Sequence, residues 1–126
     1  MTRPWHAVQL TDSQFVVSHH GPVHGVSLID KREQVKATYR NSESTELVNR
    51  PRQLAVTKNG SILVVDSCNN RIVALNSSLS SARDLSLPIE GGLKGPRCLY
   101  FNESYCRLYV GDKRVLIFDN INLRFT

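Results

Sequence analysis

The sequence has no long apolar run and few of the residues that mark specialised classes of protein. None of its apolar stretches approaches the roughly 18 residues that a membrane span requires, and residues 1–6 lack the apolar core of a secretory signal. Only three cysteines occur, at Cys68, Cys98 and Cys106, and no two form a CxxC pair. We therefore expect free thiols, and neither a disulfide framework nor a zinc knuckle.

Two features of the sequence point to different cellular compartments. Free thiols favour an intracellular location. Asn59, Asn76 and Asn102 each begin an Asn-x-Ser triplet, the acceptor pattern for glycosylation in secreted proteins.

Signatures of catalysis and cofactor binding are also missing. The sequence contains neither the GxSxG of an esterase nor the HExxH of a zincin. The glycine-rich residues 91–96 lack the Gly-Lys-Ser or Gly-Lys-Thr ending of a phosphate loop. The histidines His6, His19, His20 and His24 match no usual zinc-ligand spacing. We expect no cofactor, no metal and no catalytic residue.

What the sequence does contain is an internal repeat. Pro4, Pro51 and Pro96 stand 47 and then 45 residues apart, and each opens a short run rich in β-branched or aromatic residues. Further runs of this kind follow each proline at matching distances, and turn-forming residues separate them, whereas no segment keeps a helical period. The second strands are expected at 15–18, 62–66 and 108–112, the third at 26–30, 72–76 and 115–119, and more polar fourth strands at 34–39 and 82–87.

Four antiparallel strands in a meander make one blade of a β-propeller. We therefore predict an all-β fold of about three blades, which is half of a six-bladed ring. The whole chain, 1–126, is expected to form one partial propeller, with blade repeats at approximately 4–45, 46–90 and 91–126.

Two of these repeats resemble a known family. Residues 51–76, with Pro-x-x-Leu-Ala-Val, a glycine, Ile-Leu-Val-Val-Asp and Asn-Asn-Arg-Ile, are similar to the NHL repeat, and residues 95–119 are similar to a second copy. The match is weaker in residues 4–39, where Ser18 and Gly25 stand at the places of the family's Asp and Arg. The resemblance, as in tripartite-motif NHL proteins, implies a six-bladed propeller that serves as a protein-binding or RNA-binding scaffold. In some relatives the propeller is an enzyme, as in the lyase that completes peptide amidation.

An acidic and a basic residue bracket the same turn in two repeats. Asp66 and Arg71 flank residues 67–70, and Asp112 and Arg114 flank a shorter turn. Because a carboxylate and a guanidinium form bidentate pairs, each pair is expected to lock its turn. Repetition in adjacent blades favours this structural role over an active site.

Meander topology places the turns between second and third strands on the same rim as the links between blades. This rim is expected to be basic, with five acidic residues against nine basic ones, in a chain of net charge +5. The basic residues are Arg3, Arg40, Arg50, Arg52, Arg71, Lys94, Arg97, Lys113 and Arg114. The opposite rim has more acidic than basic residues.

The leading hypothesis is a non-enzymatic binding platform whose basic rim engages a protein segment or single-stranded RNA. Arginine and tryptophan are frequent interface anchors, and aromatic rings stack on bases. The expected binding residues are Trp5, Arg52, Asn69, Asn70, Arg97, Lys113 and Arg114. The alternative is a propeller lyase or hydrolase with a metal held near the central channel by the first-blade histidines.

Three repeats supply half the blades of a closed ring, so the terminal blades are expected to expose apolar faces. An excerpt of a longer chain is the favoured explanation, and a homodimer that closes the propeller is the alternative.

Overall fold

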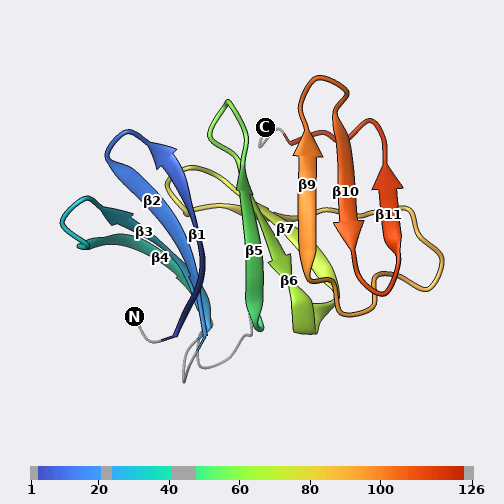
Figure 1. Cartoon of the computed structure of the whole chain (residues 1–126), viewed down its shortest axis with the longest axis horizontal. Helices are drawn as coiled ribbons and strands as arrows, with labels where there is room; N and C mark the ends of the chain where they lie inside the picture. Colours follow the sequence, from blue (N-terminus) through green and yellow to red (C-terminus); the bar gives the residue numbers. More distant parts are fainter. Residues whose placement is uncertain (1–2, 21–23, 41–47, 124–126) are drawn as a thin grey trace.

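A computed structural model describes residues 3–20, 24–40 and 48–123 of the chain (Figure 1). The described residues form three separate antiparallel sheets that stand side by side, and one short 3-10 helix, η1 (Ser67–Asn69). Blade 1 contains β1 (Pro4–Thr11), β2 (Gln14–His19), β3 (Gly25–Asp30) and β4 (Val35–Arg40). Blade 2 contains β5 (Pro51–Val56), β6 (Ile62–Asp66), β7 (Arg71–Leu75) and β8 (Ala82–Asp84). Blade 3 contains β9 (Cys98–Asn102), β10 (Arg107–Gly111) and β11 (Val115–Phe118).

The prediction of propeller blades is confirmed. In every sheet the strands pair in the order of the sequence, as in a meander, and the first strands β1, β5 and β9 are neighbours at the inner side of the three sheets. The predicted fourth strand at 82–87 is too long, because β8 ends at Asp84. Leu85 still donates its amide to Ile72 O, at 2.9 Å, and its side chain turns into the core between blades 2 and 3.

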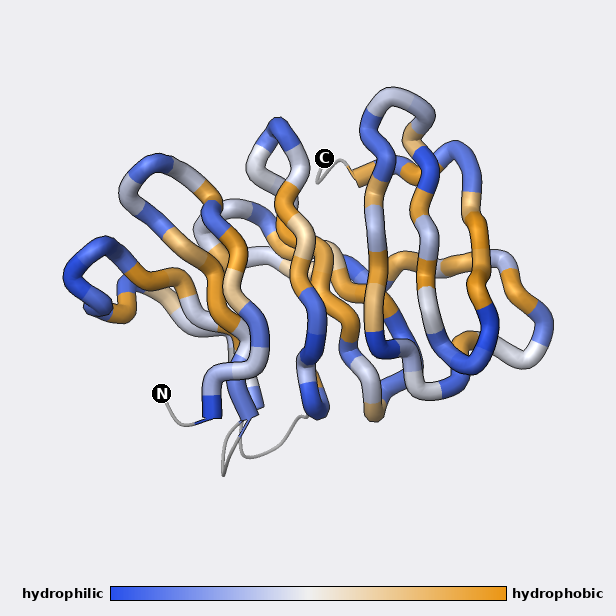
Figure 2. Tube along the Cα trace, in the orientation of Figure 1, coloured by the Kyte–Doolittle hydropathy of each residue, from blue (hydrophilic) through white to orange (hydrophobic). Residues whose placement is uncertain are grey.

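Two apolar cores lie between the three sheets, and the pattern of β6 explains why. All five residues of β6 are buried, so this strand has no solvent-facing side. Ile62 and Val64 belong to the core shared with blade 1, whereas Leu63 and Val65 belong to the core shared with blade 3. A strand covered on both faces reads as a continuous apolar run, as β6 does. Figure 2 shows these apolar strand centres between largely polar turns.

Strand direction places the ends of all three blades on common rims. Pro4 pairs with His19, Pro51 with Asp66, and Cys98 with Gly111, so these pairs lie at the same end of the three sheets, the lower edge in Figure 1. We call this end the entry rim. It comprises the β2–β3, β6–β7 and β10–β11 turns and the residues at 3, 49–50 and 94–97 that lead into the first strands.

The chain enters each blade through the same unusual backbone conformation. The residue before each blade-opening proline has a positive φ: 50° at Arg3, 54° at Arg50 and 60° at Gly95. This left-handed region is open to glycine and costs other residues about 1–2 kcal/mol. The repeat therefore extends to backbone dihedrals, with glycine at only one of the three places.

Replacing Arg50 by glycine should raise the free energy of unfolding by about 0.5 kcal/mol, because the relief of left-handed strain exceeds the entropy that glycine loses on folding. Gly95→Ala should change stability in the opposite direction, by about 1 kcal/mol, through backbone strain alone, since no heavy atom lies within 4 Å of the added Cβ. Urea unfolding of both variants at one protein concentration checks this. Changes of the same sign would contradict it.

Candidate functional site

The single tryptophan lies in a cluster that crosses from blade 1 to blade 2. The ring of His20 stacks on Trp5 with centroids 5.0 Å apart and planes inclined by 14°. The guanidinium carbon of Arg52, on the first strand of blade 2, lies 5.0 Å from the centroid of the same indole ring. Trp5 nevertheless keeps 56% of its surface exposed. The structure thus brings together two of the predicted binding residues, Trp5 and Arg52, and leaves much of the indole open.

His20 is fixed by the backbone of the neighbouring blade. Its Nε2 lies 2.7 Å from Pro51 O, and because a carbonyl only accepts, Nε2 carries the proton. Burial lowers the pKa of His20; the bond to Pro51 opposes this shift, and the nearby charges of Arg52 and Arg50 add to it. The lowered pKa favours a neutral imidazole that supports the indole without adding charge.

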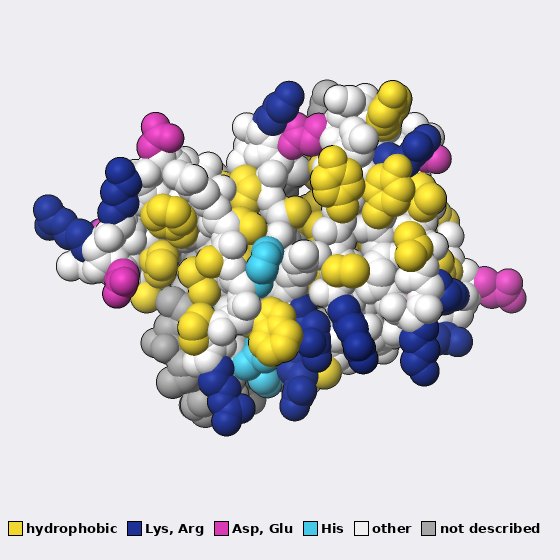
Figure 3. Space-filling model, viewed as in Figure 1, with side chains coloured by type: hydrophobic (Ala, Val, Ile, Leu, Met, Phe, Trp, Pro, Cys, Tyr) yellow, Lys and Arg dark blue, Asp and Glu magenta, His cyan; other side chains and the backbone are white. Residues whose placement is uncertain are grey.

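Basic side chains surround this cluster along the entry rim (Figure 3). Arg3, Arg50 and Arg97 are exposed residues beside the first strands of blades 1, 2 and 3, respectively. Lys113 is an exposed residue in the β10–β11 turn. The side chain of Arg40 and the residues Glu43 and Glu46, counted toward this rim from sequence, lie outside the described residues. The described part of the rim therefore combines an aromatic surface with several exposed cations.

Other predicted binding residues have their polar groups engaged within the fold. Asn69 Nδ2 donates to Asp66 Oδ2 at 2.9 Å. Asn70, which has a left-handed backbone, accepts the amide of Gly95 on its Oδ1 at 2.7 Å. These two side chains join the β6–β7 turn to its own blade and to the link toward blade 3, so they shape the rim.

Asp66 lies at the centre of the turn lock expected from sequence. Its side chain is fully buried, and its Oδ2 accepts Arg71 Nε at 2.7 Å. Its Oδ1 accepts the amide of Asn49 at 2.7 Å. The carboxylate therefore ties the β6–β7 turn to the segment that enters blade 2, a function that the Asp–Arg spacing alone did not reveal.

Asp112 repeats this arrangement in blade 3. Arg114 Nη2 donates to its Oδ2 at 2.8 Å, and the backbone amide of Arg114 donates to its Oδ1 at 2.7 Å. The hydrogen bonds from Arg114 hold the pKa of the Asp112 carboxyl well below its usual range. Lys94, two residues before Pro96 as Asn49 is two before Pro51, donates its amide to Asp112 Oδ2 at 3.0 Å. Arg114 is thus occupied as a lock partner, although it was also expected as a binding residue.

At the place of the ionic lock, blade 1 has a chain of hydrogen bonds through His19, Ser27 and Thr38. His19 Nε2 lies 2.9 Å from Ser27 Oγ, which in turn lies 3.1 Å from Thr38 Oγ1. The sequence comparison placed Ser18 at the position of Asp66, and this assignment is wrong by one residue. In the sheet His19 pairs with Pro4, as Asp66 pairs with Pro51, and each of the two residues lies 15 positions after its proline.

Neighbouring blades are joined by side chains that bind the backbone of the next first strand. His6 Nδ1 accepts the amide of Leu54 at 2.9 Å, and Gln53 Oε1 accepts the amide of Leu99 at 2.7 Å. His6 and Gln53 each stand third in their first strand. Ser18 Oγ adds a bond to Arg52 O at 2.7 Å. These joints were not predicted from the sequence, because the two acceptors, an imidazole and an amide, differ chemically. The only signal in the sequence is that both residues stand third in their first strand.

The histidines of blade 1 do not gather into a metal centre. In the part of the chain that the structure describes, no three His, Cys, Asp or Glu residues are arranged to hold a metal ion. Cys68, Cys98 and Cys106 are free and exposed.

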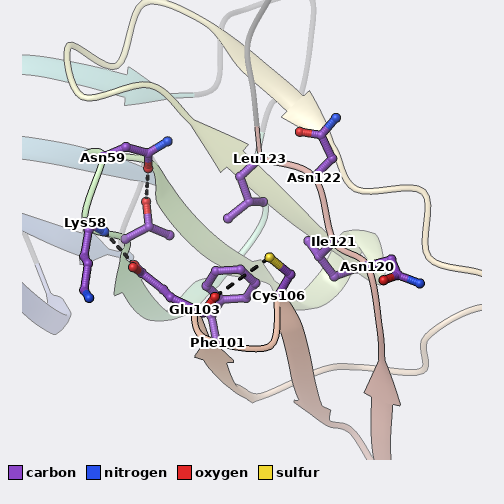
Figure 4. A pocket seen from close by; sticks show the side chains of 10 residues that line it. Lys58, Asn59, Phe101, Glu103, Cys106, Asn120, Ile121, Asn122 and Leu123 are labelled. Atoms are coloured by element: carbon purple, nitrogen blue, oxygen red, sulfur yellow. Dashed lines mark hydrogen bonds between the residues drawn. The ribbon is translucent and has the colours of Figure 1, made fainter.

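A hollow of about 500 Å³ opens on the opposite rim, between the β5–β6 and β9–β10 turns (Figure 4). Phe101, Ile121 and Leu123 supply its apolar lining. Glu103 Oε1 accepts the amide of Lys58 at 2.6 Å and bridges the two turns. None of the predicted site residues lines this hollow.

No helix among the described residues is long and apolar enough to cross a membrane.

Comparison with known proteins found one matching repeat model and a solved structure of similar fold. Residues 48–75 match the model of the NHL repeat. Over 94% of its length the chain is similar to the structure of a streptogramin B lyase, with a TM-score of 0.67 and 15% sequence identity. The chain spans 41% of the length of that protein, and an identity this low shows a common fold alone. A search of characterised proteins by sequence found no match. Residues 48–75 are thus similar to an NHL repeat, and they contain β5, β6 and β7 of the middle blade of a partial β-propeller.

Proposed function

We propose that the chain is a non-enzymatic binding platform that engages an anionic partner, either single-stranded RNA or an acidic protein segment, through its entry rim. The observation that carries this proposal is the Trp5 cluster. An indole ring that remains 56% exposed is held between blades by the stacked ring of His20 and the guanidinium of Arg52. A rigid, exposed aromatic surface costs little entropy when it binds a planar group.

The charges around this ring support an anionic partner. Arg3, Arg50, Arg97 and Lys113 are exposed on the same rim, whereas two of its acidic groups, Asp66 and Asp112, are paired with arginines in locks. Cations beside an aromatic surface are the usual means of holding a phosphate backbone while a base stacks. The same surface also suits a peptide with acidic side chains and an aromatic anchor.

A salt titration separates single-stranded RNA from a protein segment that binds mainly through apolar contacts. Binding of RNA releases condensed counterions, so its affinity should fall steeply as salt rises from 50 to 200 mM, by about 10-fold or more for a few phosphate contacts. Binding that rests on apolar peptide contacts should hardly respond. Because Trp5 is the single tryptophan of the chain, its intrinsic fluorescence reports contact at the site directly.

Replacing Arg52 and Arg97 together by alanine should weaken binding of a fluorescein-labelled single-stranded RNA about 10-fold at 0.1 M salt, because two cations of the rim are lost. The melting temperature should stay nearly unchanged, since the hydrogen bond that Arg52 accepts from Ser18 of blade 1 uses its backbone oxygen. Fluorescence anisotropy measures the affinity.

Lys31 and Arg32 provide the matched control. Both are exposed in the β3–β4 turn on the opposite rim, so Lys31→Ala with Arg32→Ala removes the same charge at a distance from the Trp5 cluster. The control variant should bind like the wild type. Equal weakening in both variants, or in neither, would remove the entry rim from consideration.

Contacts of the histidines favour binding over the lyase alternative. A metal near the central channel would need free imidazole nitrogens directed at one point. His6 Nδ1 instead accepts Leu54 N, and His20 Nε2 contacts Pro51 O, so these nitrogens hold blades 1 and 2 together. Stoichiometric zinc or calcium in metal analysis of the purified protein would overturn this preference.

A further inference from the structure

One face of blade 3 carries a concentration of exposed apolar side chains. Among the described residues, six large hydrophobic side chains are more than half exposed, and three of them lie on this face: Tyr100 at 63%, Val115 at 77% and Ile117 at 57%. The sheet register aligns them, since Tyr109 pairs with both Tyr100 and Ile117. The hydrophobic side chains over β9 and β10 are visible in Figure 3. We call the face formed by Tyr100, Tyr109, Val115 and Ile117 the outer face of blade 3.

On the corresponding face of blade 2, the residues of β6 and β7 are completely buried. The pair Leu63 and Ala74 stands at the place of Tyr109 and Ile117, and the four residues Leu63, Val65, Ile72 and Ala74 are 0% exposed against blade 3. In blade 1, Val16 and Leu28 form the equivalent pair and pack against blade 2. The same sheet face therefore forms an interface between blades in both places where a following blade is described.

The residue that would join the first strand of blade 3 to a following blade is also exposed. His6 and Gln53, each third in its first strand, accept the amides of Leu54 and Leu99 of the following blade. In blade 3 the third residue after the link, counted from Pro96, is Cys98, which is exposed. The outer face of blade 3 thus has both parts of a blade-to-blade interface, an apolar sheet face and an outward-facing side chain at the joint position.

We propose that a second copy of this chain occupies this face, with its blade 1 packed against blade 3 of the first copy. Blade 1 presents the complementary surface. In blade 2 the surface that contacts the preceding blade contains the pairs Leu54–Val64 and Ile62–Leu75. In blade 1 the corresponding pairs are Ala7–Val17 and Phe15–Ile29.

The surface of blade 1 has the chemistry that this contact needs. None of its four side chains is charged, and Ala7, Phe15 and Ile29 are at least partly exposed. Ala7 corresponds to Leu54 and Leu99, so its position opposes Cys98 at the joint. When blade 3 of each copy packs against blade 1 of the other copy, a two-fold axis relates the two copies. The six blades then form a closed ring without a free sheet face.

Light scattering on the 126-residue chain tests this. The expected mass is 28.4 kDa, twice 14.2 kDa. Ile117→Arg should give a folded 14.2 kDa monomer, because it places a charge in the centre of the contact. Ser78→Arg is the control, since Ser78 is exposed in the β7–β8 turn of blade 2, outside the contact, and this variant should remain a dimer. A wild-type monomer at tens of micromolar, or assemblies larger than two copies, would overturn the proposal.

Cross-linking tests the register of the contact. In a background of Cys68→Ser and Cys106→Ser, Ala7→Cys places a thiol opposite Cys98 of the second copy. Mild oxidation or a short bismaleimide should then give a covalent dimer on a non-reducing gel. Ser80→Cys, on the opposite rim, should give none in the same background. Equal yields from the two variants would contradict the arrangement, and circular dichroism of each variant verifies the fold. The outcome is independent of the entry-rim proposal, because Arg52→Ala with Arg97→Ala should leave the dimer intact.

Discussion

Replacing Asp66 by alanine should lower the free energy of unfolding by about 3 kcal/mol. The carboxylate is fully buried and accepts hydrogen bonds from Asn49 N, Asn69 Nδ2 and Arg71 Nε. Truncation leaves these donors without their acceptor and releases both the β6–β7 turn and the segment entering blade 2. Chemical denaturation at a fixed protein concentration measures the loss.

Asp84→Ala is the control for Asp66→Ala. Asp84 also faces Arg71, at 3.8 Å, but its side chain is half exposed, so its loss should cost less than about 0.5 kcal/mol. Comparable losses in the two variants would show that burial of Asp66 does not determine its contribution. Unchanged stability with lost ligand binding would instead make Asp66 a binding residue.

Replacing Leu108 by alanine should lower the free energy of unfolding by about 3 kcal/mol, within the range for large core truncations. Leu108 is 0% exposed in the core between blades 2 and 3, where Phe118 is its partner across the sheet. The cavity would open in the contact that holds the two blades together. Thermal unfolding followed by circular dichroism reports the change.

Val35→Ala supplies the comparison for Leu108→Ala. Val35 is an aliphatic residue on a strand as well, but it is half exposed, so the substitution should change stability by less than about 0.5 kcal/mol. A large effect at Val35 with none at Leu108 would refute the assignment of the core.

The spacing of prolines and the apolar runs were sufficient to predict the blades. Each strand of this meander pairs with its neighbour in sequence, so local pattern and tertiary order agree. The Asp66–Arg71 pair was visible for the same reason, since both residues flank one short turn. Asn49, however, binds Asp66 through its backbone amide, and no side-chain pattern indicates which amide a carboxylate accepts.

The candidate site was predictable in part. Meander topology placed Trp5 and Arg52 on one rim, although they are 47 residues apart, but the stacking of His20 on Trp5 depends on side-chain rotation. The polar groups of Asn69 and Asn70 are engaged in the fold, because Asn69 donates to the buried Asp66 carboxylate and Asn70 accepts the amide of Gly95 in the link toward blade 3. The assignment of Ser18 instead of His19 was an error of alignment, since His19 follows Pro4 by the same 15 residues by which Asp66 follows Pro51.

Gln53 and Leu54 are consecutive residues, yet they belong to two different joints. Gln53 accepts the amide of the following blade at Leu99, and Leu54 offers its own amide to His6 of the preceding blade. A single dipeptide therefore contains the acceptor of one connection and the donor of the other. A duplicated blade carries both with it and can be inserted between two existing neighbours without a compensating change in either. Repeats linked in this way can multiply by duplication of one unit, and each copy can then vary its exposed turn residues independently.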